Sequence, residues 1–204
     1  MDPIKGTIIK TSELIFFYPL HTITNYQSIH STKLITSIKN IKGFYKGIKY
    51  QLLFLPINRY IDLKILENND ISFKSALLSS TCKILTYPLQ TYEIYYQLNN
   101  KKPPFNFLLK GYHYFYIYNT ISYYIWFNSL KIYSDNINIK NNLIKNAFVG
   151  FLSGITVDII VNPLKVIKLN YQNNTIPKTY YSGLKLRILF SAIQSSYFNI
   201  LINY

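Results

Sequence analysis

The chain has 204 residues, of which 49% are apolar and 15% are charged, and its formal net charge is +14. With a mean hydropathy of +0.07, this composition is compatible with a soluble domain and with a polar membrane protein. Cys82 is the only cysteine, which excludes intramolecular disulfides and any zinc cluster built from cysteines. The abundance of Asn, Ile, Lys and Tyr is typical of AT-rich genomes, such as those of some protists or large viruses, and this bias inflates the positive charge.

Charged side chains are absent from three long stretches, residues 14–32, 111–130 and 188–204. A helix of roughly 20 residues crosses a bilayer, so these stretches are candidate spans. Tyr, Asn, Ser and Thr interrupt them, which suits helices that line a wet cavity better than a lone membrane anchor.

The pattern predicts six long helices. The first covers residues 11–30, with Thr11 or Ser12 as its cap and Glu13 in its first turn, where the helix dipole favours an acid. A short amphipathic helix is expected next, near residues 32–39. The other long helices are expected over residues 47–67, 73–97, 111–133, 143–172 and 183–204.

A Pro-Leu motif occurs three times, as YPLHTITNYQ, YPLQTYEIYYQ and NPLKVIKLNYQ. The prolines, Pro19, Pro88 and Pro163, lie 69 and 75 residues apart, which is a repeat period. A glycine ahead of an apolar and aromatic run follows each proline by 28, 23 or 20 residues. The chain therefore predicts one domain over residues 1–204 with three repeats, residues 11–70, 71–135 and 142–204, each a proline-containing helix, a connector and a glycine-initiated helix.

This pattern resembles the mitochondrial carrier family. Each of the three repeats in that family carries Pro-x-Asp/Glu-x-x-Lys/Arg on an odd-numbered helix and an aromatic-x-Gly ahead of the even-numbered helix. The resemblance implies an all-α membrane protein with six transmembrane helices in three pseudo-symmetric two-helix repeats, the odd helices being kinked at Pro19, Pro88 and Pro163. The three connectors after the proline helices are rich in Lys and lack acids, which predicts that they share one side of the membrane. In the family that side is the matrix.

In such carriers the charges after the prolines form a ring of pairs between repeats that closes the cavity on the matrix side. In this chain Gln97 and Gln172 fall where the family places a bracing glutamine, and Ser28 occupies that slot in the first repeat. None of the implied pairs is the usual acid with a base. By position, the matrix-side gate would pair His21 with Glu93, Gln90 with Lys168, and Lys165 with Thr24.

Substrate contacts in the family come from the middle of the even-numbered helices. Arg59 is the strongest candidate here, because an arginine at membrane depth needs water, a partner or an anion. Arg59 and Asp62 share a helix face, so partial neutralisation of one by the other is expected. The implied substrate-binding residues are Asn58, Arg59, Asp62, Tyr116, Asn119, Thr120, Phe190, Ser191 and Gln194.

The resemblance implies a transporter that exchanges an anionic metabolite by alternating access across the inner mitochondrial membrane. A nucleotide is the first substrate candidate, because Lys165 and Lys168 make the expected cavity positive. The implied form is a multi-pass monomer in the lipid bilayer of the mitochondrial inner membrane, with cardiolipin as a candidate lipid, and in the host mitochondrion if the gene is viral. No cofactor, metal, nucleic acid or enzymatic activity is expected, since His21, His30 and His113 lack metal-ligand spacing.

Two alternatives stay open. The altered ring favours a degenerate carrier-like membrane protein that serves as a non-transporting scaffold. The charge of +14 and the abundant aromatic residues suggest a soluble nucleic-acid binder. Against the second alternative, the basic residues alternate with the charge-free stretches.

Overall fold

The structure is a computed structural model that describes residues 2–32, 34–41, 43–99 and 101–203. These residues are all-helical, which confirms the predicted all-α class. Short 3-10 turns cover Ile84–Thr86 and Phe105–Phe107. The α-helices are α1 (Pro3–His30), α2 (Leu34–Asn40), α3 (Ile48–Asn68), α4 (Phe73–Lys83), α5 (Tyr87–Asn99), α6 (Tyr112–Asn136), α7 (Asn142–Gln172) and α8 (Leu184–Asn203).

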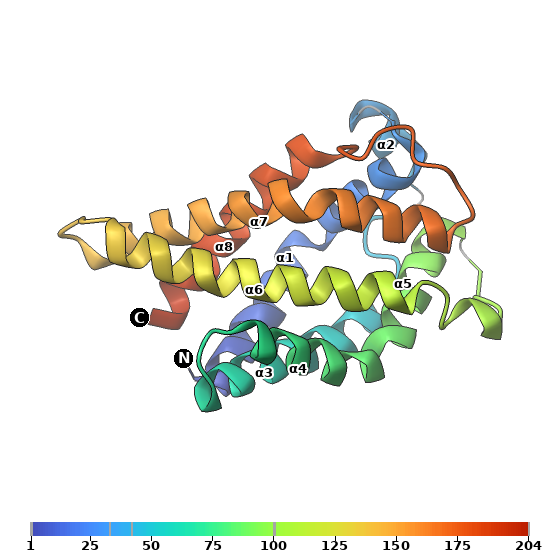
Figure 1. Ribbon diagram of the computed structural model, residues 1–204. Coiled ribbons are helices and arrows are strands. Elements are labelled where there is room, and N and C mark those ends of the chain that lie inside the picture. Colours follow the sequence, from blue (N-terminus) through green and yellow to red (C-terminus); the bar gives the residue numbers. More distant parts are fainter. Residues whose placement is uncertain (1, 33, 42, 100, 204) are drawn as a thin grey trace.

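The helices form an elongated bundle with both chain ends at the same end of it (Figure 1). The turns that join α3 to α4 and α6 to α7 also lie there. At the opposite end lie α2 and the connectors that follow α5 and α7. We call this the connector end, and it holds residues 34–41, 43–47, 101–111 and 173–183.

The helices pack as a closed ring. In chain order, α1 packs on α3, α3 on α4 and α5, α4 on α6, α6 on α7, and α7 on α8. The ring closes because α8 returns to pack on α1. The last helix of the chain therefore meets the first, as expected for three units around one axis.

The glycines before α3, α6 and α8 have a positive φ, of 85° at Gly47, 80° at Gly111 and 75° at Gly183. This left-handed conformation favours glycine, and it turns the connector into the next helix. A Cβ atom at these positions would also press against α5, α7 and α1, respectively. The contacts would be with Glu93 Cγ at 3.1 Å, Gln172 Cγ at 3.4 Å and Gln27 Cβ at 3.3 Å, respectively.

The first helix starts earlier than predicted. It begins at Pro3, and the Asp2 side chain accepts hydrogen bonds from the backbone N–H groups of Ile4 (2.8 Å) and Lys5 (3.3 Å). An aspartate cap followed by proline at the first helical position is a strong start signal, and it overrides Thr11 and Ser12. The prediction of a cap at those residues was wrong, and Glu13 lies in the helix interior.

The three repeat prolines are not equivalent in their helices. Pro19 and Pro163 lie inside α1 and α7. Pro88 follows a 3-10 turn that separates α4 from α5, so the expected helix over residues 73–97 is broken just before the proline. A proline removes one backbone donor and crowds the preceding turn, which accounts for the break.

Two apolar clusters lie toward opposite ends of the bundle. The larger one, near the termini, includes Leu63, Phe127 and Phe198. The smaller one, toward the connector end, consists of Ile29, Ile94 and Leu169, with Leu98 packed against it. Between the two clusters, buried polar side chains mix with apolar ones such as Leu14, Phe54 and Phe190.

Among the described residues, α7 is the one helix that is long and apolar enough to span a membrane, with a hydropathy of 1.7 in its best window. Only 39% of that window is buried inside the bundle. The six transmembrane spans therefore remain a prediction, because the other helices are too short or too polar to meet this criterion.

Candidate functional site

A polar cavity lies between the two apolar clusters. It consists of two adjoining chambers of about 290 and 300 Å³. One chamber reaches Phe127 and Phe198 of the larger cluster, and the other reaches Ile94 and Leu169 of the smaller one. Because both chambers share lining residues, the cavity is continuous along the bundle axis.

Most of the predicted substrate-binding residues line this cavity. Tyr116 and Thr120 do not, and Thr120 is buried with its hydroxyl donating to Ser80 Oγ of α4 at 2.9 Å. On α6 the cavity face is formed instead by positions three or four residues apart, including Tyr118 and Ser122. Two of the three residues predicted on α6 therefore lie outside the cavity lining. The predicted residues that line the cavity are Asn58, Arg59, Asp62, Asn119, Phe190, Ser191 and Gln194.

The cavity carries an excess of positive charge. Two of its acids are neutralised locally, since Lys10 Nζ lies 2.6 Å from Glu13 Oε1 and Lys83 Nζ lies 2.5 Å from Asp62 Oδ1. The complete charged lining is Lys10, Arg59, Lys83, Lys165, Lys168 and Arg187 against Glu13, Asp62, Glu93 and Asp158.

Arg59 forms no ion pair with Asp62, although the two residues share a helix face as predicted and the carboxylate acts on the guanidinium at longer range. Asp62 is occupied by Lys83 and by the Ser79 hydroxyl, which donates to the same carboxylate. The Arg59 guanidinium instead lies over the Phe198 ring, 3.8 Å from its centroid, and makes no ion pair among the described residues. Its buried Nε has no hydrogen-bond partner. Arg59 is thus a cavity cation whose charge no carboxylate neutralises directly.

Two of the three pairs expected between repeats are in contact. His21 Nδ1 lies 3.6 Å from Glu93 Oε1, which joins α1 to α5. Lys168 Nζ donates to Gln90 Oε1 at 2.8 Å, which joins α7 to α5. The Lys168 ammonium also lies 5.0 Å from the centroid of the Phe115 ring.

The third expected pair is not formed. The Thr24 hydroxyl donates to the backbone oxygen of His21 at 2.9 Å. Lys165 lines the cavity and makes no hydrogen bond or ion pair within the described part of the chain. The Thr24 hydroxyl is neutral, so it attracts the Lys165 ammonium group only weakly.

Arg187 of α8 joins the third repeat to the first instead. Its guanidinium, only 3% exposed, donates to Asn162 Oδ1 and, at 2.9 Å, to Ser28 Oγ of α1. Asn170 Nδ2 donates to the backbone oxygen of Ser28 at 3.1 Å. Sequence reasoning missed Arg187, although two signals were present: it lies one helical turn after Gly183, and Ser28 stands in a slot where a longer side chain was expected.

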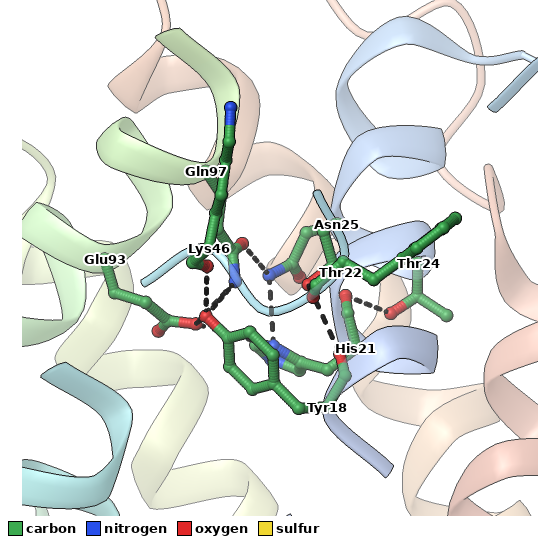
Figure 2. Close-up of polar contacts among 9 residues, drawn as sticks. Tyr18, His21, Thr22, Thr24, Asn25, Lys46, Glu93 and Gln97 are labelled. Carbon is green, nitrogen blue, oxygen red and sulfur yellow. Dashed lines mark hydrogen bonds and ion pairs between the residues drawn. The ribbon is translucent and has the colours of Figure 1, made fainter. Parts of the chain in front are cut away.

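The two bracing glutamines differ in what they hold. Gln97 Nε2 donates to Glu93 Oε1 at 2.8 Å and to the Tyr18 hydroxyl at 2.7 Å, and Gln97 Oε1 accepts from Asn25 at 3.2 Å (Figure 2). Gln172 Nε2 donates to the Tyr87 hydroxyl at 2.9 Å. Only Gln97 therefore touches a member of an inter-repeat pair.

The residue before each repeat proline ties its helix to the connector. The Tyr18 hydroxyl donates to the backbone oxygen of Lys46 at 2.5 Å, and the Tyr87 hydroxyl donates to that of Lys110. In the third repeat, Asn162 Nδ2 donates to the backbone oxygen of Tyr180 at 2.9 Å. This shared role was missed because Tyr and Asn differ in shape, although both can donate a hydrogen bond.

No protein-family model matches this chain, and a search of curated proteins found no match. Within the described residues, no group of three or more His, Cys, Asp or Glu side chains is placed to hold a metal ion.

Proposed function

We propose that this chain is a carrier-type membrane transporter that moves a small anion by alternating access. The observation that carries the proposal is the closed ring of helices around a polar cavity, with contacts between repeats made by the residues that follow the prolines. Three helical units around one axis can part at their interfaces without unfolding, which is what access from alternating sides requires.

Charge supports an anionic substrate. Two cavity cations, Arg59 and Lys165, lack an ion-pair partner among the described residues. Burying unpaired cations is costly, so a site that keeps them is suited to a ligand that supplies the opposite charge. A phosphate or carboxylate group meets this need, and a nucleotide remains the first candidate.

Membrane insertion is supported by the outer surface. The apolar helix α7 turns Ile144, Phe148, Ile159 and Ile160 outward, each between 47% and 53% exposed. In a soluble protein these side chains would form a costly contact with water, whereas lipid would cover them. The proposed setting is the inner mitochondrial membrane, as a multi-pass monomer with cardiolipin as a candidate lipid.

Labelled nucleotide uptake into liposomes that hold the purified protein tests the proposal, with and without nucleotide inside. Uptake that requires internal nucleotide supports exchange. Arg59→Ala and Lys168→Ala should abolish it, whereas Lys64→Ala should not, since Lys64 pairs with Glu67 on the surface outside the cavity. Failure of the folded protein to take up nucleotides, phosphate or carboxylates would contradict the proposal.

A non-transporting scaffold is the second candidate, and the absent contact between Lys165 and Thr24 favours it. The same liposomes decide between the two, because a scaffold would insert and fold without moving any anion. Carbonate extraction separates both from a soluble nucleic-acid binder, which would leave the membrane pellet.

A further inference from the structure

The His21–Glu93 contact differs from the other inter-repeat contacts, because both of its members are side chains that bind or release a proton between about pH 4 and 7 in water. Glu93 is 1% exposed, and no Lys or Arg of the described chain lies within ion-pair distance of it. Its Oε2 atom is buried and has no hydrogen-bond partner. A carboxylate in such surroundings is strongly disfavoured unless a proton neutralises it.

The donors and acceptors around the Tyr18 hydroxyl show which group carries a proton. The tyrosine hydroxyl has one hydrogen, and the backbone oxygen of Lys46, at 2.5 Å, can only accept it. The Tyr18 oxygen also lies 3.1 Å from Glu93 Oε1 (Figure 2). With the tyrosine hydrogen already used, this contact is favourable only if Glu93 supplies the hydrogen.

The contacts of His21 also bear on the protonation of Glu93. Asn25 Nδ2 has two hydrogens, one directed to Gln97 Oε1 at 3.2 Å and the other to His21 Nδ1 at 3.4 Å. His21 Nδ1 then accepts and carries no proton of its own. At 3.6 Å from Glu93 Oε1, a ring nitrogen without a proton supplies no positive charge to a carboxylate, so the histidine does not neutralise Glu93.

Burial disfavours both the carboxylate of Glu93 and a charged His21, so the pair is neutral when the proton lies on Glu93. The cations that face the pair are Lys10 of α1, Lys165 and Lys168 of α7, and Arg187 of α8, and all four act on the imidazole. They oppose a second positive charge on His21. Lys165 and Lys168 also act on Glu93 and favour its ionised form, as does the hydrogen bond with Tyr18, but the burial of the carboxyl group has the larger effect.

We propose that His21 and Glu93 form a proton-binding site, and that closing the connector end of the cavity takes one proton onto Glu93. When the end opens, the pair meets water, where a histidine is neutral above about pH 6.5 and a glutamate is ionised above about pH 4.3. The proton then leaves to water on the connector side. The coupling to transport rests on the proposed function, whereas the proton site itself does not.

The sign of the pH dependence follows from the proton count. Between about pH 4.3 and 6.5, the unfolded chain holds one proton on His21, and the folded pair holds one on Glu93, so this pair gives no slope. Above about pH 6.5 the unfolded pair holds none, so the folded state loses stability as pH rises. The folding equilibrium constant should fall by up to about tenfold per pH unit through this pair.

Denaturant unfolding of the full chain in detergent, from pH 4 to 8.5, tests the site. Glu93→Gln keeps a neutral side chain that can donate to Tyr18, so it should lack the slope that the wild-type protein shows above about pH 6.5. Glu67→Gln is the matched control and should retain that slope, because Glu67 lies on the surface and pairs with Lys64. Equal slopes for wild type and Glu93→Gln would overturn the proposal.

His21→Asn gives a second test that does not depend on the folding of Glu93→Gln. Without the histidine, the unfolded chain gives up its last proton at the glutamate, so the slope should begin near about pH 4.3 rather than 6.5. An unchanged starting point would overturn the assignment of the proton to Glu93. If the slopes behave as expected and no labelled anion is taken up by liposomes, the proton site stands and the transport proposal fails.

Discussion

Ser28→Ala tests the contact that joins the third repeat to the first. Ser28 Oγ lies 2.9 Å from the Arg187 guanidinium, across the interface between α1 and α8. The substitution removes this acceptor and leaves the backbone and the neighbouring helices in place. Arg187 then keeps Asn162 as its remaining side-chain acceptor.

The size of the effect follows from the charge and burial of Arg187. A hydrogen bond to a charged group contributes about 1.5 to 3 kcal/mol, and its loss costs more when the charged group stays buried. Ser28 Oγ also donates to the backbone oxygen of Thr24 at 2.7 Å, a bond within its own helix. Ser196→Ala measures the cost of losing such a bond within a helix, because Ser196 Oγ donates only to the backbone oxygen of Ala192, at 2.8 Å.

Denaturant unfolding of the two variants in the same detergent gives the comparison. Ser28→Ala should be less stable than Ser196→Ala by about 1.5 to 3 kcal/mol, which is a factor of about 10 to 150 in the folding equilibrium constant. In liposomes, the weaker interface should raise the rate at which the connector end opens. Leakage of a preloaded anion from Ser28→Ala vesicles would therefore exceed that from Ser196→Ala vesicles.

Equal stabilities of Ser28→Ala and Ser196→Ala would refute the reasoning. That result would mean that Arg187 does not hold α1 and α8 together, and that the guanidinium finds water or another acceptor at no cost. The third interface would then depend on contacts to the backbone of α1, such as the hydrogen bond from Asn170 to the backbone oxygen of Ser28.

Three further substitutions test the packing and charge of the bundle by denaturant unfolding. Gly150→Ala places a Cβ atom 2.3 Å from the Ser195 backbone oxygen, so α7 and α8 must separate at a cost of about 1 to 3 kcal/mol, and wild-type stability would contradict this close approach. Asp62→Asn leaves the ammonium of Lys83 buried without its carboxylate and should cost about 3 to 5 kcal/mol; a loss below about 1 kcal/mol would mean that Lys83 reaches water. Tyr87→Phe removes one buried hydroxyl that both donates and accepts, at a cost of about 1 to 3 kcal/mol, and an unchanged stability would show that the connector needs no such tie.

The prolines and glycines, whose spacing predicts the repeat, act through the backbone. Proline removes a donor and glycine permits a positive φ, and both effects depend little on the rest of the fold. The three glycines accordingly share one conformation, with φ between 75° and 85°. The start of α1 was predicted less well. The local cap at Asp2 begins the helix at Pro3, before the stretch that lacks charged side chains.

Side-chain partners were harder to predict, because they depend on the rotation of each helix about its axis. A shift of one or two positions along α6 moves a side chain by about 100° per residue, which is enough to turn Thr120 from the cavity toward Ser80. The same uncertainty hid the pairing of Asp62 with Lys83, since these residues lie on different helices. The repeat predicts which helices meet, but not which of several polar side chains on them will be nearest.

The three interfaces of the ring have different chemistry, and this difference has a consequence for how the connector end opens. The first interface holds the titratable pair His21 and Glu93, the second holds Lys168 and the neutral Gln90, and the third depends on Arg187. Arginine stays charged at any pH that the protein tolerates, so the third interface is insensitive to pH. In the proposed transport cycle, deprotonation would therefore loosen the contact between α1 and α5 first, and three similar sequence motifs would give an asymmetric opening.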